Sequence, residues 1–176
     1  MSMPISHRVR DLAQSDIRAM TRRCMEVGGI NLGQGICDLP TPPLVRDAAL
    51  QAILDRKSTY SPCEGILPLR QAIAAKLERD NHIIADPCSE IIVTAGSAAA
   101  FACTLHALLD PGDGILIAEP YYGYHVNAAR VAGVEVHSLV LEEPDYLLDA
   151  DSLRAGLRPN TRALLLCSPG NPSGHM

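Results

Sequence analysis

The chain has 176 residues and a net charge of −5, with 15 lysine and arginine residues against 20 aspartate and glutamate residues, and almost half of its residues are hydrophobic. This size and composition are typical of an ordinary globular domain and argue against intrinsic disorder. The acidic balance implies no basic face, so nucleic acid is not expected as a partner.

The N-terminal half is predicted to consist of helices and loops. An arm and a short helix over 11–27 come first, and INLGQGICDLPTPP then forms a short strand that runs into a loop rich in glycine and proline. Pro43 and Pro68 can each occupy the first turn of a helix, where a missing N–H has no cost. Apolar residues recur at helical spacing after each proline, so two helices are predicted there, separated by the loop STYSPCEG.

From residue 91 onward the sequence predicts alternating strands and helices. Strands are expected over 91–94, 115–118, 134–141 and 162–167, and helices over 98–109, over 123–132 and from a cap at Asp149 to Leu157. Continuous apolar strands joined by helices indicate an α/β fold, a mainly parallel sheet with helices on both faces. The stretch 91–109 has no formal charge, but its polar residues favour a buried strand and helix over a membrane span.

The cysteines suggest neither a metal site nor a disulfide scaffold. None of the six forms a C-x-x-C pair, so zinc-ribbon and thioredoxin-like interpretations lose their main support. The chain is long and apolar for a disulfide framework, and the N-terminus has no apolar segment of signal-peptide length. Reduced thiols in the cytoplasm are therefore expected.

Three loops carry the residues of chemical interest, and each follows a predicted strand. They are Ala95-Gly96-Ser97-Ala98, Glu119-Pro-Tyr-Tyr-Gly-Tyr124 and Ser168-Pro-Gly-Asn-Pro-Ser-Gly174. In parallel sheets, ligands bind beyond the carboxyl ends of the strands. The sequence therefore predicts that the three loops converge on one ligand site.

Each loop has a functional and a purely structural interpretation. The glycine turn at a helix start can bind phosphate, or it can simply be a tight turn. The tyrosines can offer a flat face to a planar heterocycle, or they can cover the end of the sheet. Asn171, between two prolines, can donate its amide to a ligand oxygen, or it can serve as a turn residue. A phosphate, a planar ring and an oxygen that needs a donor together describe pyridoxal 5′-phosphate (PLP).

From about Ile30 to its end, the sequence resembles the class I/II aminotransferases, which are PLP-dependent enzymes of fold type I. The stretches that carry the resemblance are INLGQGICDLPTP, YSPCEGILPLR, IIVTAGSAAAF, DPGDGILIAEPYYGY and LLLCSPGNPSG. The opening motif looks most like the branch that contains the kynurenine, glutamine and methionine aminotransferases.

The resemblance implies a role for each matching residue. Gly96, Ser97 and Ala98 match the phosphate-binding turn, Tyr122 the aromatic residue that stacks on the pyridine ring, and Asn171 the asparagine that donates to the ring hydroxyl oxygen. Tyr60 matches a tyrosine that crosses a homodimer interface to the partner's cofactor phosphate, and Gly35 a position near the substrate carboxylate. The resemblance also implies cis peptide bonds before Pro120 and Pro172. His125 and Arg130 are expected on the surface of a helix.

The resemblance further implies a division into an N-terminal arm with part of a small domain over 1–42, and an incomplete PLP-binding large domain over 43–176.

The sequence departs from the family pattern at three places, two of which are small: Cys37 stands where proline is usual, and Ala99-Ala100 where glutamate or glutamine is frequent. A larger one concerns the lysine that forms a Schiff base with PLP, which lies well downstream of the N-P-[ST]-G motif in the family. The only lysines here are Lys57 and Lys76, so no catalytic residue is assigned.

The implied parent enzyme exchanges an amino group between an amino acid and a 2-oxo acid. This chain would be its N-terminal portion, inactive alone, with the rest supplied by a longer gene product, a second chain or further residues. Two alternatives stay open: a PLP-dependent C–S lyase or cyclopropane-forming synthase of the same fold, and a non-catalytic aminotransferase-like remnant.

Overall fold

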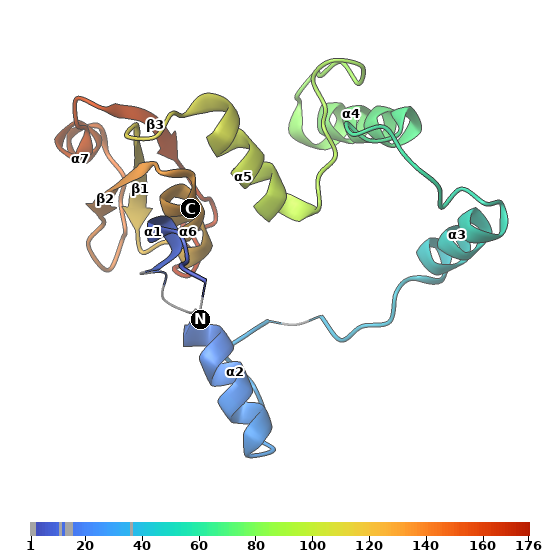
Figure 1. Ribbon diagram of the computed structural model, residues 1–176, viewed down its shortest axis with the longest axis horizontal. Helices are drawn as coiled ribbons and strands as arrows, with labels where there is room; N and C mark the ends of the chain where they lie inside the picture. Colours follow the sequence, from blue (N-terminus) through green and yellow to red (C-terminus); the bar gives the residue numbers. More distant parts are fainter. Residues whose placement is uncertain (1–2, 11, 13–15, 36) are drawn as a thin grey trace. The chain divides into compact units, whose positions relative to one another are not determined.

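The computed structural model describes residues 3–10, 12, 16–35 and 37–176. The chain divides into two compact units, coloured along the sequence in Figure 1. We call the described part of 1–15 together with Ala95–Met176 the sheet unit, and Asp16–Thr94 the helical unit. The helical unit contains α2 (Asp16–Glu26), α3 (Pro43–Leu54) and α4 (Leu67–Asn81). The sheet unit contains α1 (His7–Arg10), α5 (Gly96–Leu108), β1 (Gly114–Glu119), α6 (Gly123–Ala132), β2 (Glu135–Val140), α7 (Ala150–Gly156) and β3 (Thr161–Leu165).

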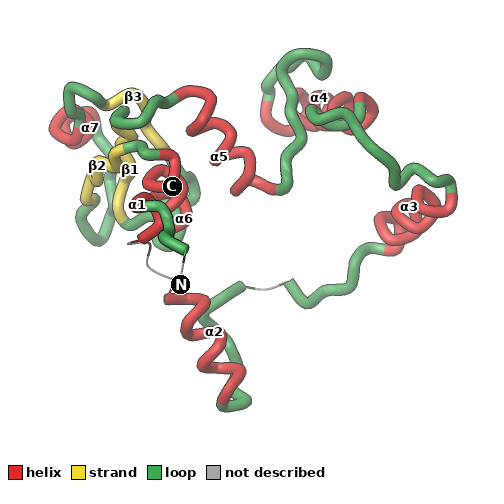
Figure 2. The backbone as a smooth tube through the Cα atoms, in the orientation of Figure 1, coloured by secondary structure: helices red, strands yellow, loops and turns green. Residues whose placement is uncertain are grey.

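The three strands form a parallel sheet in the order β2-β1-β3 (Figure 2). β1 pairs with β2 in continuous register from Gly114 opposite Glu135 to Glu119 opposite Val140. Its pairing with β3 shifts once, between Gly114 and Ile115. Because all strands run the same way, their carboxyl ends lie at one edge of the sheet.

Helices cover both faces of this sheet, as the sequence predicts. Ile115 and Ile117 of β1 pack into a core with Leu105 of α5 and Val126 of α6. Leu116, between them on β1, faces the other way and approaches Gly156 of α7. The chain steps from β1 outward to β2 and then back across β1 to β3. Right-handed crossovers in opposite directions place their helices on opposite faces.

Local signals set the ends of several helices. Pro43 and Pro68 both stand in the first turn of their helices. Asp149 caps α7 through a reciprocal pair with Ser152: its carboxylate accepts from the Ser152 N–H at 2.7 Å, and its own N–H donates to the Ser152 hydroxyl at 3.2 Å. α6 ends at Gly133, whose φ of 83° is favourable for glycine.

Two predicted strands are absent from the structure, and one predicted helix is shorter. The segment 91–94 has no regular secondary structure, and its Val93 N–H donates to the Glu64 carbonyl, in the loop before α4, at 3.0 Å. The segment that begins at Ile30 forms bends and loop. The helix predicted over 11–27 is α2, which begins at Asp16; residues 11 and 13–15 lie outside the described part of the chain.

Within the residues that the structure describes, no helix combines the length and apolar character needed to cross a bilayer. The stretch 91–109 contains a segment without regular secondary structure followed by α5. The domain boundary expected at 42 stays a prediction.

Candidate functional site

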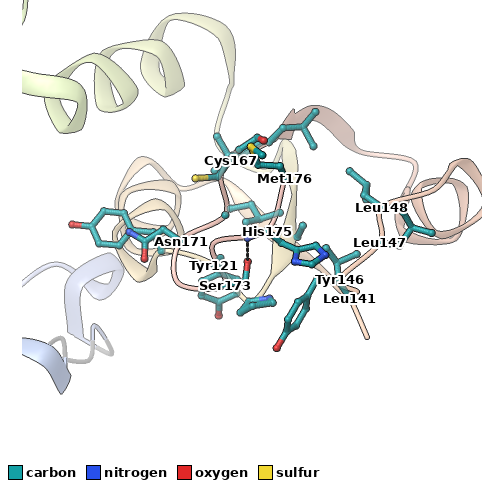
Figure 3. Close-up of a pocket in the computed structure, with 18 of the residues that line it drawn as sticks. Tyr121, Leu141, Tyr146, Leu147, Leu148, Cys167, Asn171, Ser173, His175 and Met176 are labelled. Carbon is teal, nitrogen blue, oxygen red and sulfur yellow. Dashed lines mark hydrogen bonds between the residues drawn. The ribbon is translucent and has the colours of Figure 1, made fainter. Parts of the chain in front are cut away.

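A cavity of about 390 Å³ opens where the three strands end (Figure 3). Its walls come from the residues after β1, from Leu141 after β2, from Leu165 to Ser168 at the end of β3, and from the loop between β2 and α7. Volumes of this size are typical of small-molecule sites. The carboxyl edge of the sheet therefore carries a cavity, at the place where the sequence predicts a ligand.

Two of the predicted binding residues, Tyr122 and Asn171, line this one cavity. Tyr122 is the residue that precedes α6, and 45% of its surface is exposed. Asn171 follows β3 and precedes a cis peptide bond to Pro172. The peptide between Glu119 and Pro120 is also cis, so both cis bonds implied by the resemblance are present. The tyrosine loop and the asparagine loop thus meet at one site.

The third predicted loop is close to the tyrosine loop but does not line the cavity. Gly96, Ser97 and Ala98 form the exposed first turn of α5, and Gly96 has a φ of 78°. The Tyr124 hydroxyl donates to the Ala98 carbonyl at 2.7 Å and so ties this turn to α6. The turn is therefore beside the cavity rather than in its wall.

His125 departs from the expectation of a surface position, whereas Arg130 is exposed as expected. The imidazole of His125 lines the cavity and contacts two rings edge to face, with centroid distances of 5.0 Å to Phe101 and 5.4 Å to Tyr122. Partial burial lowers the pKa of His125 below its ordinary value of 6.5 and so favours the neutral form of the ring. Sequence reasoning missed it because helical spacing alone does not show which face meets α5.

Tyr146 is a second cavity residue that sequence reasoning missed. Its φ of 44° is unusual for a residue other than glycine. Its hydroxyl donates to the Glu143 carboxylate at 2.8 Å, and this bond raises the pKa of the Tyr146 hydroxyl. The centroid of its ring lies 5.8 Å from that of His175, and Figure 3 shows the two side chains next to each other. Tyr146 is the only tyrosine outside the stretches that carry the family resemblance. The Pro144-Asp145 pair that precedes it is the only local signal of a turn there.

The other predicted residues belong to the helical unit. Gly35 and Tyr60 are both exposed, Tyr60 completely so. Both lysines lie in the same unit: Lys57 pairs with Asp55 at 3.1 Å, and the Lys76 ammonium donates to Asn81 at 2.7 Å. Neither lysine is in the unit that holds the cavity.

The geometry defines an α/β protein with a cavity at the carboxyl edge of a parallel sheet, and comparison with known proteins identifies its family. The family model for aminotransferase class I and II matches residues 27–176. This chain belongs to that family.

Several relatives are similar over nearly the whole chain. A probable N-succinyldiaminopimelate aminotransferase, DapC, of Mycobacterium tuberculosis is 37% identical over 95% of this chain and 43% of its own length. The aspartate/prephenate aminotransferase of Thermus thermophilus is 35% identical over 97% of this chain and 46% of its own. The structure of YbdL from Escherichia coli, described as having a methionine aminotransferase function, matches with a TM-score of 0.91 at 29% identity, over 99% of this chain and 46% of its own.

The chain therefore spans less than half the length of these relatives. Their names include four different amino donors or acceptors, so the branch expected from the opening motif stays a prediction. The fold type and the family expected from the sequence are confirmed.

Proposed function

We propose that the whole protein is a PLP-dependent aminotransferase that exchanges an amino group between an amino acid and a 2-oxo acid. The observation that carries this proposal is the cavity lined by Tyr122 and Asn171, in a chain that belongs to the class I and II aminotransferase family and is similar to named aminotransferases. PLP, when bound, supplies the electron sink for this chemistry, while the protein orients the reactants and controls charge.

The chain's own residues fit the chemical groups of PLP. The Tyr122 ring lines the cavity and offers a face for stacking on a planar heterocycle. The Asn171 amide can donate a hydrogen bond to the ring hydroxyl oxygen. Gly96, Ser97 and Ala98 are exposed at the start of a 13-residue helix, where the dipole and backbone N–H groups favour a phosphate.

The helical unit is proposed to contribute to the site in a homodimer. We assign Tyr60 to the partner subunit's cofactor phosphate and Gly35 to the neighbourhood of the substrate carboxylate, on the family motifs that they match. The full exposure of the Tyr60 side chain is consistent with a role outside its own unit. We further propose that the protein acts in the cytoplasm, on soluble amino acid and 2-oxo acid substrates.

PLP affinity of the whole protein tests the assignment of Tyr122 and Asn171. Replacing Tyr122 with Ala or Asn171 with Ala removes a stacking surface or one hydrogen bond, so the dissociation constant for PLP should rise about three- to tenfold in each. The matched control Asn81→Ala removes a surface amide of the helical unit and should leave this constant unchanged. If neither cavity variant differs from the control in an absorbance titration, the proposed site is wrong.

The chain of 176 residues by itself should show no transamination above that of free PLP. Lys57 follows α3 and Lys76 lies on α4, so neither lysine follows a strand at the place where the family has the lysine that binds the cofactor covalently and moves the substrate proton. Formation of 2-oxo acid from a panel of amino acids is the measurement. Turnover above the free cofactor would contradict the expectation, and release of ammonia and pyruvate by the whole protein would favour a C–S lyase instead.

A further inference from the structure

His125 is a titratable side chain enclosed by aromatic rings, and the proposed function leaves it without a role. Its ring meets Phe101 of α5 at an interplanar angle of 64° and Tyr122 at 89°, both edge to face. A third ring, that of Tyr124, has its centroid 6.3 Å away. Edge-to-face pairs at these separations are attractive beyond the area that they bury.

The backbone also joins His125 to Tyr122. The His125 N–H donates to the Tyr122 carbonyl at 3.0 Å in the first turn of α6. On the far side of the cluster, Tyr124 is held by its hydrogen bond to the Ala98 carbonyl. The imidazole therefore has a fixed support on α5 and α6, and it lines the cavity together with Tyr122.

Besides His125, the Tyr122 ring meets the ring of Tyr124, tilted by 32° at a centroid distance of 6.0 Å. Almost half of the Tyr122 side chain is exposed, and its hydroxyl makes no hydrogen bond among those found in the described chain. A ring on a loop can turn about its two side-chain torsions unless neighbours restrict it. Stacking on a planar ligand requires one orientation, and a ring held in that orientation before binding loses less entropy when the ligand arrives.

Resting on the proposed function, we infer that His125 is a positioning residue: its imidazole, wedged between Phe101 and Tyr122, holds the Tyr122 ring in the orientation that stacks on PLP. The lowered pKa of the partly buried imidazole agrees with this role, because a neutral ring can pack in an aromatic cluster without the cost of burying a charge. His125 thus acts through Tyr122 and not by proton transfer.

A double-mutant cycle on the whole protein separates this role from simple packing of α6 on α5. The variants are His125→Ala, His125→Phe, Tyr122→Ala and the double variant His125→Ala with Tyr122→Ala. The readouts are the PLP dissociation constant, the visible circular dichroism of bound PLP, which reports the orientation of its ring, and the thermal unfolding midpoint. The exposed histidine of α5 provides the matched control, His106→Ala.

We expect His125→Ala to weaken PLP binding about three- to tenfold and to reduce the visible circular dichroism signal, whereas His125→Phe keeps both close to wild type. In the Tyr122→Ala background, His125→Ala should cause no further loss. An equal loss in both backgrounds, or no loss beyond that of the His106 control, would overturn the inference.

Two further results keep the test decisive. If His125→Ala does not fold, His125→Leu fills the same space without a flat ring, and retention of wild-type affinity and circular dichroism by this variant also overturns the inference. If Tyr122→Ala alone leaves PLP affinity unchanged, the proposed stacking role of Tyr122 is wrong, and that failure is visible before His125 is considered.

Discussion

Gly114 has a neighbour on β2 that leaves no space for a side chain. It is a buried residue at the start of the central strand, and a Cβ atom there would collide with the imidazole of His137. That ring is in turn bonded to the Thr161 hydroxyl of β3 at 2.9 Å, so it cannot withdraw without losing a bond. His137 therefore joins the two outer strands across the central one, and it requires glycine beneath it.

We predict that Gly114→Ala destabilises the sheet unit by about 1–3 kcal/mol, the usual cost of forcing extra atoms into a packed site. Urea unfolding followed by far-ultraviolet circular dichroism measures the loss. Combining the change with His137→Ala should recover most of it, because the obstructing ring is then gone. Gly123→Ala is the matched control, since nothing lies within contact of its added methyl group. Equal effects of the two glycine substitutions would contradict the steric explanation.

At the scale of the element, α4 depends on one buried cation. Among the residues that the structure describes, Arg70 is the only charged one that is buried, with 7% of its surface exposed. Its guanidinium donates to the Gly65 carbonyl at 3.0 Å, to the Pro87 carbonyl at 2.6 Å and to the Cys88 carbonyl at 3.2 Å. The planar fork of donors therefore joins α4 to the loops on either side of it in the chain.

Replacing Arg70 with Met should destabilise the helical unit by about 2–4 kcal/mol, because three part-buried hydrogen bonds from a charged donor are lost. Arg70→Lys keeps the charge but not the fork, so it should recover only part of the loss. On the same helix, Arg79 pairs with Asp80 at the surface, and Arg79→Met should change little. Thermal unfolding of the three variants measures the differences, and similar midpoints for Arg70→Met and Arg79→Met would refute the prediction.

The start of α7 depends on an ionised cap. Hydrogen bonds from Ser152 lower the pKa of Asp149 below its ordinary value of 3.8. A carboxyl group whose pKa is lower in the folded chain adds stability above its unfolded pKa and loses it as pH falls through the folded pKa. Asparagine caps a helix almost as well without a charge.

At about pH 7, the thermal unfolding midpoint of the wild type should therefore be higher than that of Asp149→Asn, by a few degrees at most. This difference between the two midpoints should disappear as pH falls below about 4. Parallel melting curves of the two proteins across this range make the test. The same comparison with Asp151→Asn, whose carboxylate pairs with Arg154 at an exposed position, serves as control. A gap that widens toward low pH would contradict the sign of the prediction.

At the scale of the whole molecule, the two units differ in how much core they hold. Among the buried hydrophobic side chains of the described chain, Ile91 belongs to the helical unit and all others belong to the sheet unit. α2 and α3 bury no side chain, and many of their apolar residues are exposed. Since buried apolar area is the main source of stability, the two units should open with different free energies.

Hydrogen exchange on the isolated chain should show this difference. Amides of β1 from Ile115 to Ile117, buried between α6 and α7, should exchange about 100-fold or more slowly than those in the middle of α3. Mass spectrometry of peptides from both segments provides the comparison. Equal protection would mean that the helical unit has a core of its own, contrary to its exposure.

Most of the fold followed from local sequence signals. The strand and helix alternation after residue 110, the bounds of α6 and the cap of α7 are all set by neighbours in the chain, and the structure confirms them. The set of short motifs was enough to identify the family, because each motif is a run of adjacent residues. Cis bonds at Pro120 and Pro172 were likewise implied by motif alone.

The tertiary structure alone decided the features that need a distant partner. An apolar run such as 91–94 becomes a strand only where another strand pairs with it, and here Val93 bonds instead to the loop at Glu64. The cavity wall includes His125 and Tyr146, which local periodicity does not place together with Asn171. Sequence patterns act over one or two turns of chain, whereas strand pairing and cavity walls depend on residues far apart in sequence that only packing brings together.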